Sequence, residues 1–495
     1  MAATSPSRAS GGAGPEAGED PESSADMTCL PTDQVKITDD GDELKVLSDD
    51  GRINAWPMAQ LIRRNYKFLT FKDQDGEIYY YESGIYKPYG EHLIKTFIQG
   101  LYGSAASTHT VNETVNHIKR GTYADRAMID DDSNYICLEN GVLDITTGAF
   151  APHSPLKVFL SKIPVNYDPA ATCPGIDQFI SEIVAEEDRE LLYEVIAYCL
   201  VPGYPIQKAF MFVGTGNNGK STYLNLVKTF LGADSCSSVT LQDLDKNRFA
   251  SADLYGRRAN ICPDISNQEL KRTGTFKGLT GGDSMRAEKK GQDSFNFENR
   301  AKMLFSCNSV PLSDDDSDAF YRRWVIVDLP YKFEGAALKL DMLERITTKA
   351  ELSGLLNKVL PLCKKILEER GFSKAGSTEA TRLKYVRLSD SVYCFFDLCC
   401  TVNNGVIDEC GSIVSAPGVV RKVDLYRAYV DFCRDERLSP LKEGKFHRKI
   451  QEHAPNISEV RVKESGQTVR CWRGLELNTP VEIEENKKQS TLGQF

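Results

Sequence analysis

The sequence predicts an α/β fold for the centre of the chain, and three observations support this prediction. Between residues 206 and 330, short apolar runs alternate with segments of helical periodicity, as in a sheet covered by helices. A glycine-rich loop joins the first run, residues 209–213, to the first helical segment. Two later runs each lead to a polar residue, Asp264 and Asn308. The regions on either side are expected to form separate units.

The glycine-rich loop is the strongest signal in the sequence. It matches the complete pattern G-x-x-x-x-G-K-[ST] and consists of Gly214, Thr215, Gly216, Asn217, Asn218, Gly219, Lys220 and Ser221. Glycines let backbone N–H groups curl around phosphate oxygens at the start of a helix, where the helix dipole favours anions. Lys220 would neutralise the β- and γ-phosphates, and Ser221 would bind Mg²⁺. With Thr222 behind them, these residues predict a site for ATP and Mg²⁺.

The later strand runs provide candidate catalytic groups. Asp264 ends the run that begins at Ala259, where it could hold Mg²⁺ through water and polarise the attacking water. An ordinary strand followed by a surface aspartate is the alternative. The next residue is Ile265 rather than a second acid, so the general base is left open, with Glu269 as a distant candidate. Asn308 could contact the γ-phosphate or orient the water.

An arginine pair, Arg322 and Arg323, precedes the strand run 325–327. An arginine supplied across a subunit boundary stabilises transition-state charge and is worth about 10³–10⁵ in rate. A surface salt bridge is the alternative for either residue alone. The order of the loop, Asp264, Asn308 and the arginine pair along the chain favours the catalytic interpretation.

This ordered set resembles the superfamily 3 helicases, and more closely the poxvirus-type and phage or plasmid primase–helicase family. The resemblance covers about residues 60–478 and includes the upstream segments 137–144 and 163–168. It implies an AAA+ type ATPase core, assembled as a hexameric ring in which an arginine acts in trans. It also implies translocation on single-stranded DNA with 3′→5′ polarity. Relatives often carry a primase domain, which is not evident here, so we expect any primase activity to come from another polypeptide.

A segment between Asp264 and Asn308 is similar to a further motif of that family, which implies a hairpin that projects into a central pore. Gly281 and Gly282 supply a turn there. The cations that could contact a phosphate backbone are Lys277, Arg286, Lys289 and Lys290. A solvated charged loop is the alternative, and the position between two motor motifs favours DNA.

The domain boundaries follow from composition and periodicity. We expect a disordered acidic tail over 1–50, an α+β and helical region over 51–200, and the ATPase core over 201–345. A helical connector over 346–385 leads to a winged-helix-like domain over 386–478 and a flexible tail over 479–495. The acidic run Asp130 to Asp132 is interpreted as a solvated loop.

The C-terminal unit combines two helical segments, 423–433 and 442–450, with a strand pair that turns at Ser465 and Gly466. This order predicts a winged helix, which could bind DNA or dock a protein. In the tail, Gln489, Leu492 and Phe495 resemble the box that binds the sliding clamp PCNA. A fortuitous polar tail is the alternative for this short pattern.

Bulk properties narrow the function classes. The net charge is −10, but residues 1–50 carry 12 Asp/Glu and 3 Lys/Arg, so the remaining chain is nearly neutral and can hold local basic patches. The sequence shows neither a membrane span nor a signal peptide, so a cytoplasmic location is expected. The 14 cysteines are expected to be reduced, and the group 394–410 lacks the spacing of a zinc site.

Together, the motifs and the resemblance predict a replicative DNA helicase. The alternatives are an AAA+ loader or initiator and an ATP-switched DNA-binding adaptor.

Overall fold

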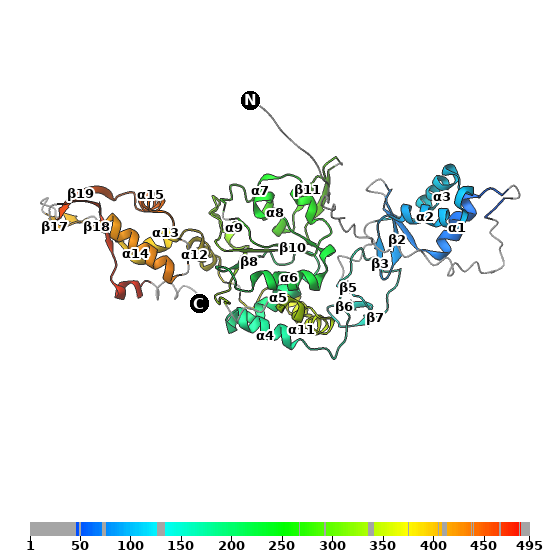
Figure 1. The fold of residues 1–495 in the computed structure, drawn as a ribbon, viewed down its shortest axis with the longest axis horizontal. Helices are drawn as coiled ribbons and strands as arrows, with labels where there is room; N and C mark the ends of the chain where they lie inside the picture. The colour runs from blue at the N-terminus through cyan, green and yellow to red at the C-terminus, as the bar shows by residue number, and fades with distance from the viewer. Residues whose placement is uncertain are drawn as a thin grey trace, which may run out of the picture.

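The computed structural model describes residues 46–48, 51–71, 76–125, 134–266, 268–291, 294–334, 341–374, 376–403, 405–407, 413–436, 438, 440–464, 467–484 and 486. Their helices and strands form three groups that follow one another along the chain (Figure 1). Each group buries its own apolar side chains. The Asp130 to Asp132 run and the tail box at Gln489, Leu492 and Phe495 lie outside the described residues.

The N-terminal group is a small sheet packed against helices. Its strands, in the order β3-β2-β1-β4, are β1 (Phe68–Phe71), β2 (Ile78–Glu82), β3 (Ile85–Lys87) and β4 (Tyr123–Ala124). Its helices are α1 (Ala55–Asn65), α2 (Gly90–Tyr102) and α3 (Thr108–Gly121), with a 3₁₀ turn η3 (Gly103–Ala105). The helices are amphipathic and bury their apolar faces with Phe68 and Ile78 of the sheet.

A second sheet and two helices lead into the central group. The sequence predicted a strand pair over 136–150; the structure has three antiparallel strands, β5 (Tyr135–Cys137), β6 (Val142–Asp144) and β7 (Phe150–Ala151). The following helical region divides into α4 (Pro174–Ile183), η6 (Glu186–Asp188) and α5 (Arg189–Leu200). Every residue of α5 from Leu191 onward is buried, which is typical of a helix enclosed on all sides.

The central sheet has five strands in the order β14-β8-β13-β10-β9, and all neighbours are parallel. They are β8 (Ala209–Val213), β9 (Cys236–Ser237), β10 (Ala259–Cys262), β13 (Lys302–Cys307) and β14 (Trp324–Asp328). The predicted α/β core is therefore confirmed, and the structure shows that its sheet is parallel. Because parallel strands end at one edge, loops after β8, β10 and β13 meet there.

Helices cover both faces of this sheet (Figure 1). One apolar layer contains α4, α5, α6 (Lys220–Leu231) and α11 (Lys349–Glu369), with α10 (Met342–Ile346) beside them. The other contains η8 (Ala250–Leu254) and the helices α7 (Leu241–Lys246), α8 (Gly274–Gly281) and α9 (Asp318–Tyr321). A 3₁₀ turn, η7 (Ala233–Ser235), precedes β9. The hairpin strands β11 (Ser284–Ala287) and β12 (Phe295–Glu298) follow α8.

The C-terminal group combines helices with short sheets. Its helices are α12 (Thr378–Ser389), α13 (Ser391–Cys399), α14 (Lys422–Asp435) and α15 (Glu443–His453). A sheet of order β18-β20-β19 is formed by β18 (Val419–Arg421), β19 (Ser458–Glu464) and β20 (Gln467–Arg473). The remaining pairs are β15 (Cys400–Val402) with β21 (Leu475–Leu477) and β16 (Val406–Ile407) with β17 (Ile413–Ser415). Tyr429 and Phe446 stack in its core.

The described cysteines are free thiols, and Cys394, Cys399 and Cys400 are buried, while Cys410 lies outside the described part. Within the described ranges, no cluster of His, Cys, Asp and Glu could hold a metal ion. No described helix has both the length and the apolar character that crossing a membrane requires.

Candidate active site

The glycine-rich loop connects β8 to α6 at the carboxyl edge of the central sheet. Gly216 (φ 104°) and Gly219 (φ 83°) adopt left-handed backbone conformations, and Gly219 directly precedes the helix. A side chain at Gly219 would also meet α4, because its Cβ would lie 2.6 Å from Ile183 Cγ2. These two glycines therefore allow the loop to turn tightly and bring Lys220 to the first turn of α6.

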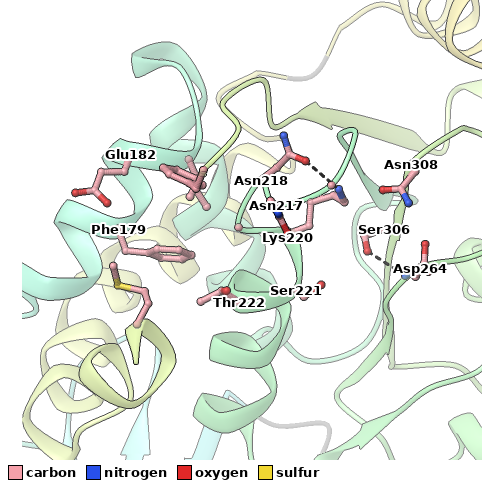
Figure 2. Close-up of a pocket in the computed structure, with 15 residues that line it drawn as sticks. Phe179, Glu182, Asn217, Asn218, Lys220, Ser221, Thr222, Asp264, Ser306 and Asn308 are labelled. Carbon is pink, nitrogen blue, oxygen red and sulfur yellow. Dashed lines mark hydrogen bonds between the residues drawn. The ribbon is translucent and has the colours of Figure 1, made fainter. Parts of the chain in front are cut away.

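The loop forms one wall of a cavity of about 350 Å³ (Figure 2). Its lining includes seven consecutive residues, 216–222, from the loop and the first turn of α6, together with both polar residues that follow the later strands. The complete lining is Phe179, Glu182, Ile183, Gly216, Asn217, Asn218, Gly219, Lys220, Ser221, Thr222, Asp264, Ser306, Asn308, Phe333 and Met342. Residues as distant in the sequence as Phe179 and Met342 thus converge on one space.

Lys220 is buried, with 8% of its surface exposed. Its Nζ donates hydrogen bonds to Gly214 O at 2.6 Å and to Asn218 Oδ1 at 3.5 Å. Burial lowers the pKa of Lys220, while the negative charge of Asp264 acts in the opposite direction. Among the described residues, no carboxylate forms an ion pair with this ammonium group. A buried cation bonded only to neutral oxygens, at a helix N-terminus, suits an anionic ligand.

Residues 329–333, which follow β14 and are called the strap below, bond to the glycine-rich loop. This contact was not predicted from the sequence. Asn218 Nδ2 donates to Leu329 O at 3.0 Å and to Tyr331 O at 2.9 Å. The N–H of Phe333 donates in turn to Asn217 O at 2.9 Å. Asn218 therefore has a structural role inside the loop, and no residue pattern near 329–333 signals this contact.

Asp264 lies on the opposite side of the cavity from α4 (Figure 2). Its backbone N–H donates to Ser306 Oγ at 3.1 Å, and the N–H of Ile265 donates to Ser306 O at 2.8 Å. Asp264 has a positive φ of 59°, a conformation that Asp tolerates better than most residues. The side chains of Asp264 and Asn308 are exposed in the cavity, close to Ser221 and Lys220. Glu269, the distant candidate base, does not line the cavity.

The wall opposite Asp264 comes from α4 and from two later segments, none of which was predicted to contribute. Phe179, Glu182 and Ile183 project from the last turns of α4, while Phe333 and Met342 complete the apolar side. The helical periodicity of 176–200 was visible in the sequence, but the contact with the loop depends on tertiary packing. Gly214 and Thr215 instead line a neighbouring cavity of about 430 Å³, which also contains Asp390.

The arginine pair lies away from the cavity within the same chain. Arg323 is 6% exposed, and its guanidinium donates to Thr280 Oγ1 at 2.9 Å and also to Ala319 O. Arg322, at the end of α9, is exposed. The structure therefore separates the two residues: Arg323 connects α8 and α9, and Arg322 is accessible to another molecule.

The predicted hairpin is present as β11 and β12, which pair in antiparallel register. Gly282 does not form its turn; it ends α8 in a left-handed conformation. Arg286, Lys289 and Lys290 are exposed on the hairpin. Lys277 differs from them, because its Nζ forms an ion pair with Asp315 at 2.7 Å. Burial alone would raise the pKa of Asp315, but hydrogen bonds from Lys277, Ser317 and Thr273 outweigh it and lower that pKa.

Two segments of the chain match protein families. Residues 59–185 match the family described as "D5 N terminal like", and residues 212–323 match a family of unknown function, DUF5906. Relatives come from large DNA viruses. The "Putative helicase L207/L206" of Acanthamoeba polyphaga mimivirus is 28% identical over 217 residues, or 41% of this chain and 22% of that protein. The "Putative helicase 121R" of Invertebrate iridescent virus 3 is 27% identical over 42% of this chain and 24% of its own length.

The "Primase D5" of Fowlpox virus is 26% identical over 41% of this chain and 28% of that protein. The chain thus spans about a quarter of the length of these relatives. A solved apo structure of the NrS-1 C-terminal region matches 84% of this chain and 97% of its own, with 13% identity and a TM-score of 0.44.

Proposed function

We propose that this chain, a member of the poxvirus-type primase–helicase family, is an ATP-driven DNA helicase that acts in replication. One observation carries the proposal: among the described residues, no carboxylate is bonded to the buried ammonium group of Lys220, which shares a cavity with Ser221, Asp264 and Asn308. Such a site suits the charged phosphates of a nucleotide and the water that attacks them. The names of the viral relatives support DNA unwinding as the purpose of hydrolysis.

The residues present fit ATP and Mg²⁺. Backbone N–H groups of residues 216–222 would hold the phosphates, and Lys220 would offset charge on the β- and γ-phosphates. Ser221 and Asp264 would hold Mg²⁺, which when bound neutralises charge that develops on the phosphates. Asn308 would orient the attacking water towards the γ-phosphate. The lining has one carboxylate besides Asp264, that of Glu182. Glu182 lies on the α4 wall, on the other side of the cavity from Asp264, so we do not assign it as the general base.

The sheet order supports an AAA+ type core. Strand β13 lies between β8, which carries the loop, and β10, which leads to Asp264, so both polar strand ends lie beside the loop. A hexameric ring would bring an arginine of one subunit to the cavity of the next. Arg322 is the better candidate for that role, because Arg323 is buried and bonded to its own chain.

Single-stranded DNA would contact the exposed cations of the β11–β12 hairpin. The C-terminal group supports a second contact, with duplex DNA, as a winged helix. Arg461 of β19 lies directly opposite Arg470 of β20, and both side chains are exposed. Like charges in directly opposite positions destabilise a strand pair. Glu459 already supplies one negative charge to both arginines, and a phosphate backbone would supply more, so DNA is the ligand that we propose for this surface.

Two partners are proposed from sequence. A separate polypeptide would supply primase activity. The segment with Gln489, Leu492 and Phe495 would bind a sliding clamp such as PCNA, at micromolar affinity or weaker for one tail. Titration of the clamp with a peptide of residues 481–495 should release heat, and a peptide with Leu492→Ala and Phe495→Ala should not. Equal binding by both peptides would exclude the box.

The central test compares ATP hydrolysis and strand displacement by the wild-type chain and by Lys220→Ala. Substrates should carry a single-stranded tail of either polarity, and 3′→5′ movement is expected. Lys228→Ala, on the exposed face of the same helix, is the matched control and should retain activity. Hydrolysis that DNA stimulates, without displacement of a DNA strand, would favour a loader or initiator. A hydrolysis rate that is the same with and without DNA would favour an ATP-switched adaptor.

A further inference from the structure

Trp56 occupies an unusual position for a tryptophan of this chain. It lies in the first turn of α1 and is 55% exposed, whereas Trp324 and Trp472 are 1% and 2% exposed. Its indole is held by α3, because the ring of His117 meets it edge-on at 5.3 Å and 73°. An aromatic ring that is both exposed and fixed in orientation offers a flat surface for stacking.

Two arginines lie on the same pair of helices as this tryptophan, one of them bonded to His117. A guanidinium nitrogen of Arg120 lies 3.4 Å from His117 Nδ1 on α3. The side chain of Arg63 on α1 lies against Gly121 of α3. A Cβ added at Gly121 would lie 2.8 Å from Arg63 Nη1. Helix α1 contains no Asp or Glu, and α3 contains one, Glu113. Four Lys/Arg residues occupy their last turns, and two of them, Arg63 and Arg120, lie between α1 and α3 or against His117.

We propose that Trp56, His117, Arg63 and Arg120 form a binding face for single-stranded DNA on the N-terminal group, separate from the hairpin of the motor. A base would stack on the Trp56 indole, and the phosphates on either side would contact Arg63 and Arg120. This inference rests on the proposed single-strand substrate. Charge complementarity favours DNA, whose phosphates match the guanidinium groups of Arg63 and Arg120.

The position of the cations has a second consequence. Arg63, Arg64, Lys119 and Arg120 also lie where the negative ends of two helix dipoles meet, which stabilises cations without any ligand. That role would not require an exposed, ordered tryptophan beside them. The stacking surface therefore distinguishes a binding face from simple helix capping, and the test should report on the indole itself.

The experiment follows tryptophan emission of the full-length chain while a twenty-nucleotide thymidine oligonucleotide is added without ATP. Because Trp324 and Trp472 are buried, quenching by stacked bases reports on Trp56. Trp56→Phe should remove the quenching yet keep most of the affinity, since a phenyl ring still stacks. Trp56→Ala should weaken binding about tenfold. Emission that does not change at saturating DNA, or full affinity in Trp56→Ala, would overturn the proposal and return the face to protein docking.

A charge-matched pair of variants tests the arginines. Arg63→Gln with Arg120→Gln should weaken binding and reduce the slope of log K against log salt concentration by about 1.4, since each contact to a single strand contributes about 0.7. Lys87→Gln with Lys95→Gln removes the same charge from exposed positions elsewhere in this group and should bind as the wild type does. Equal losses in both pairs would overturn the proposal. If the wild-type chain shows quenching by DNA but does not hydrolyse ATP, the proposed motor function is contradicted and the binding face is not.

Discussion

The hydroxyl of Ser306 accepts a hydrogen bond from the backbone N–H of Asp264 at 3.1 Å, across the parallel pair β10 and β13. Since Asp264 has a positive φ, this contact holds an unfavourable backbone conformation at the cavity. Ser306 thereby sets the position of the carboxylate without belonging to the sequence motif.

Two substitutions separate charge from position at this point. Asp264→Asn keeps a residue that tolerates positive φ, so nucleotide should still bind while kcat falls by about 10² or more. Ser306→Ala should lower kcat by about tenfold and leave nucleotide affinity unchanged, because it moves the carboxylate without removing it. Steady-state hydrolysis and a nucleotide-binding titration check both. Wild-type turnover in Asp264→Asn would contradict its assignment.

The two arginines should behave differently when replaced. Arg322→Ala should preserve thermal stability and abolish most hydrolysis if it acts in trans. Mixing it with inactive Lys220→Ala should restore some hydrolysis, because mixed interfaces join an intact loop to an intact arginine. Arg323→Ala should instead lower stability by about 1–3 kcal/mol, since buried partners at Thr280 and Ala319 lose their donor.

Arg345→Ala, an exposed position paired with Asp341, is the control for Arg322→Ala and should retain hydrolysis. Verified mixed rings that recover no activity, or a strictly monomeric active enzyme, would rule out a trans arginine.

The hairpin lysines should affect DNA handling. Lys289→Ala with Lys290→Ala should weaken single-strand binding and slow unwinding, and the loss should shrink at high salt as counterion release requires. Lys277→Ala should lower thermal stability, because it leaves Asp315 without its cation. Anisotropy titrations at several salt concentrations and thermal melts measure these effects. Unchanged unwinding in the double variant would assign the segment to a solvated loop.

Because Arg461 and Arg470 repel each other, replacing one of them with an acid should raise the stability of the C-terminal group and weaken its binding to duplex DNA. Arg470→Glu converts a like-charge pair into an ion pair, which should stabilise the C-terminal group by about 0.2–1 kcal/mol. The same change should weaken binding to blunt duplex DNA at least tenfold, because one charge at a phosphate contact is reversed in sign. Thermal melts and duplex titrations test this. A variant that is more stable and binds duplex normally would remove DNA from this surface.

Lys302 predicts how the free energy of unfolding depends on pH. It is 1% exposed, its Nζ donates to the carbonyls of Val201 and Gly203, and burial lowers its pKa to about 7. Between pH 7 and about 10.5, the unfolded chain holds a proton that the folded chain has released, so stability rises with pH over this window. The rise is on the order of a few kcal/mol.

Lys302→Met should remove most of this rise, and urea unfolding at pH 7, 8 and 9 would measure it. Lys364→Met, on an exposed position of α11, should leave the slope unchanged. A pH slope that persists in Lys302→Met would show that another group dominates.

Several elements followed directly from local sequence. The loop at 214–221, the preceding strand and the helix that begins at Lys220 lie within about 25 consecutive residues. Their chemistry therefore needs no distant contact to be recognised. The helices over 422–435 and 443–453 likewise follow from periodicity, because apolar residues at helical spacing must face one core. The domain boundaries and the roles of the site residues remain predictions.

Tertiary structure decided what local patterns could not. The α4 wall with Phe179, the strap bonded to Asn218 and the support of Asp264 by Ser306 join residues more than 35 positions apart, and no periodicity records such contacts. The different environments of Arg322 and Arg323 also depend on packing, since adjacent residues at the end of a short helix point in different directions. The sequence by itself determined the α/β alternation and predicted a phosphate-binding loop, because both depend on residues that are neighbours in the chain. The enclosure of the cavity depends on how distant strands and helices pack.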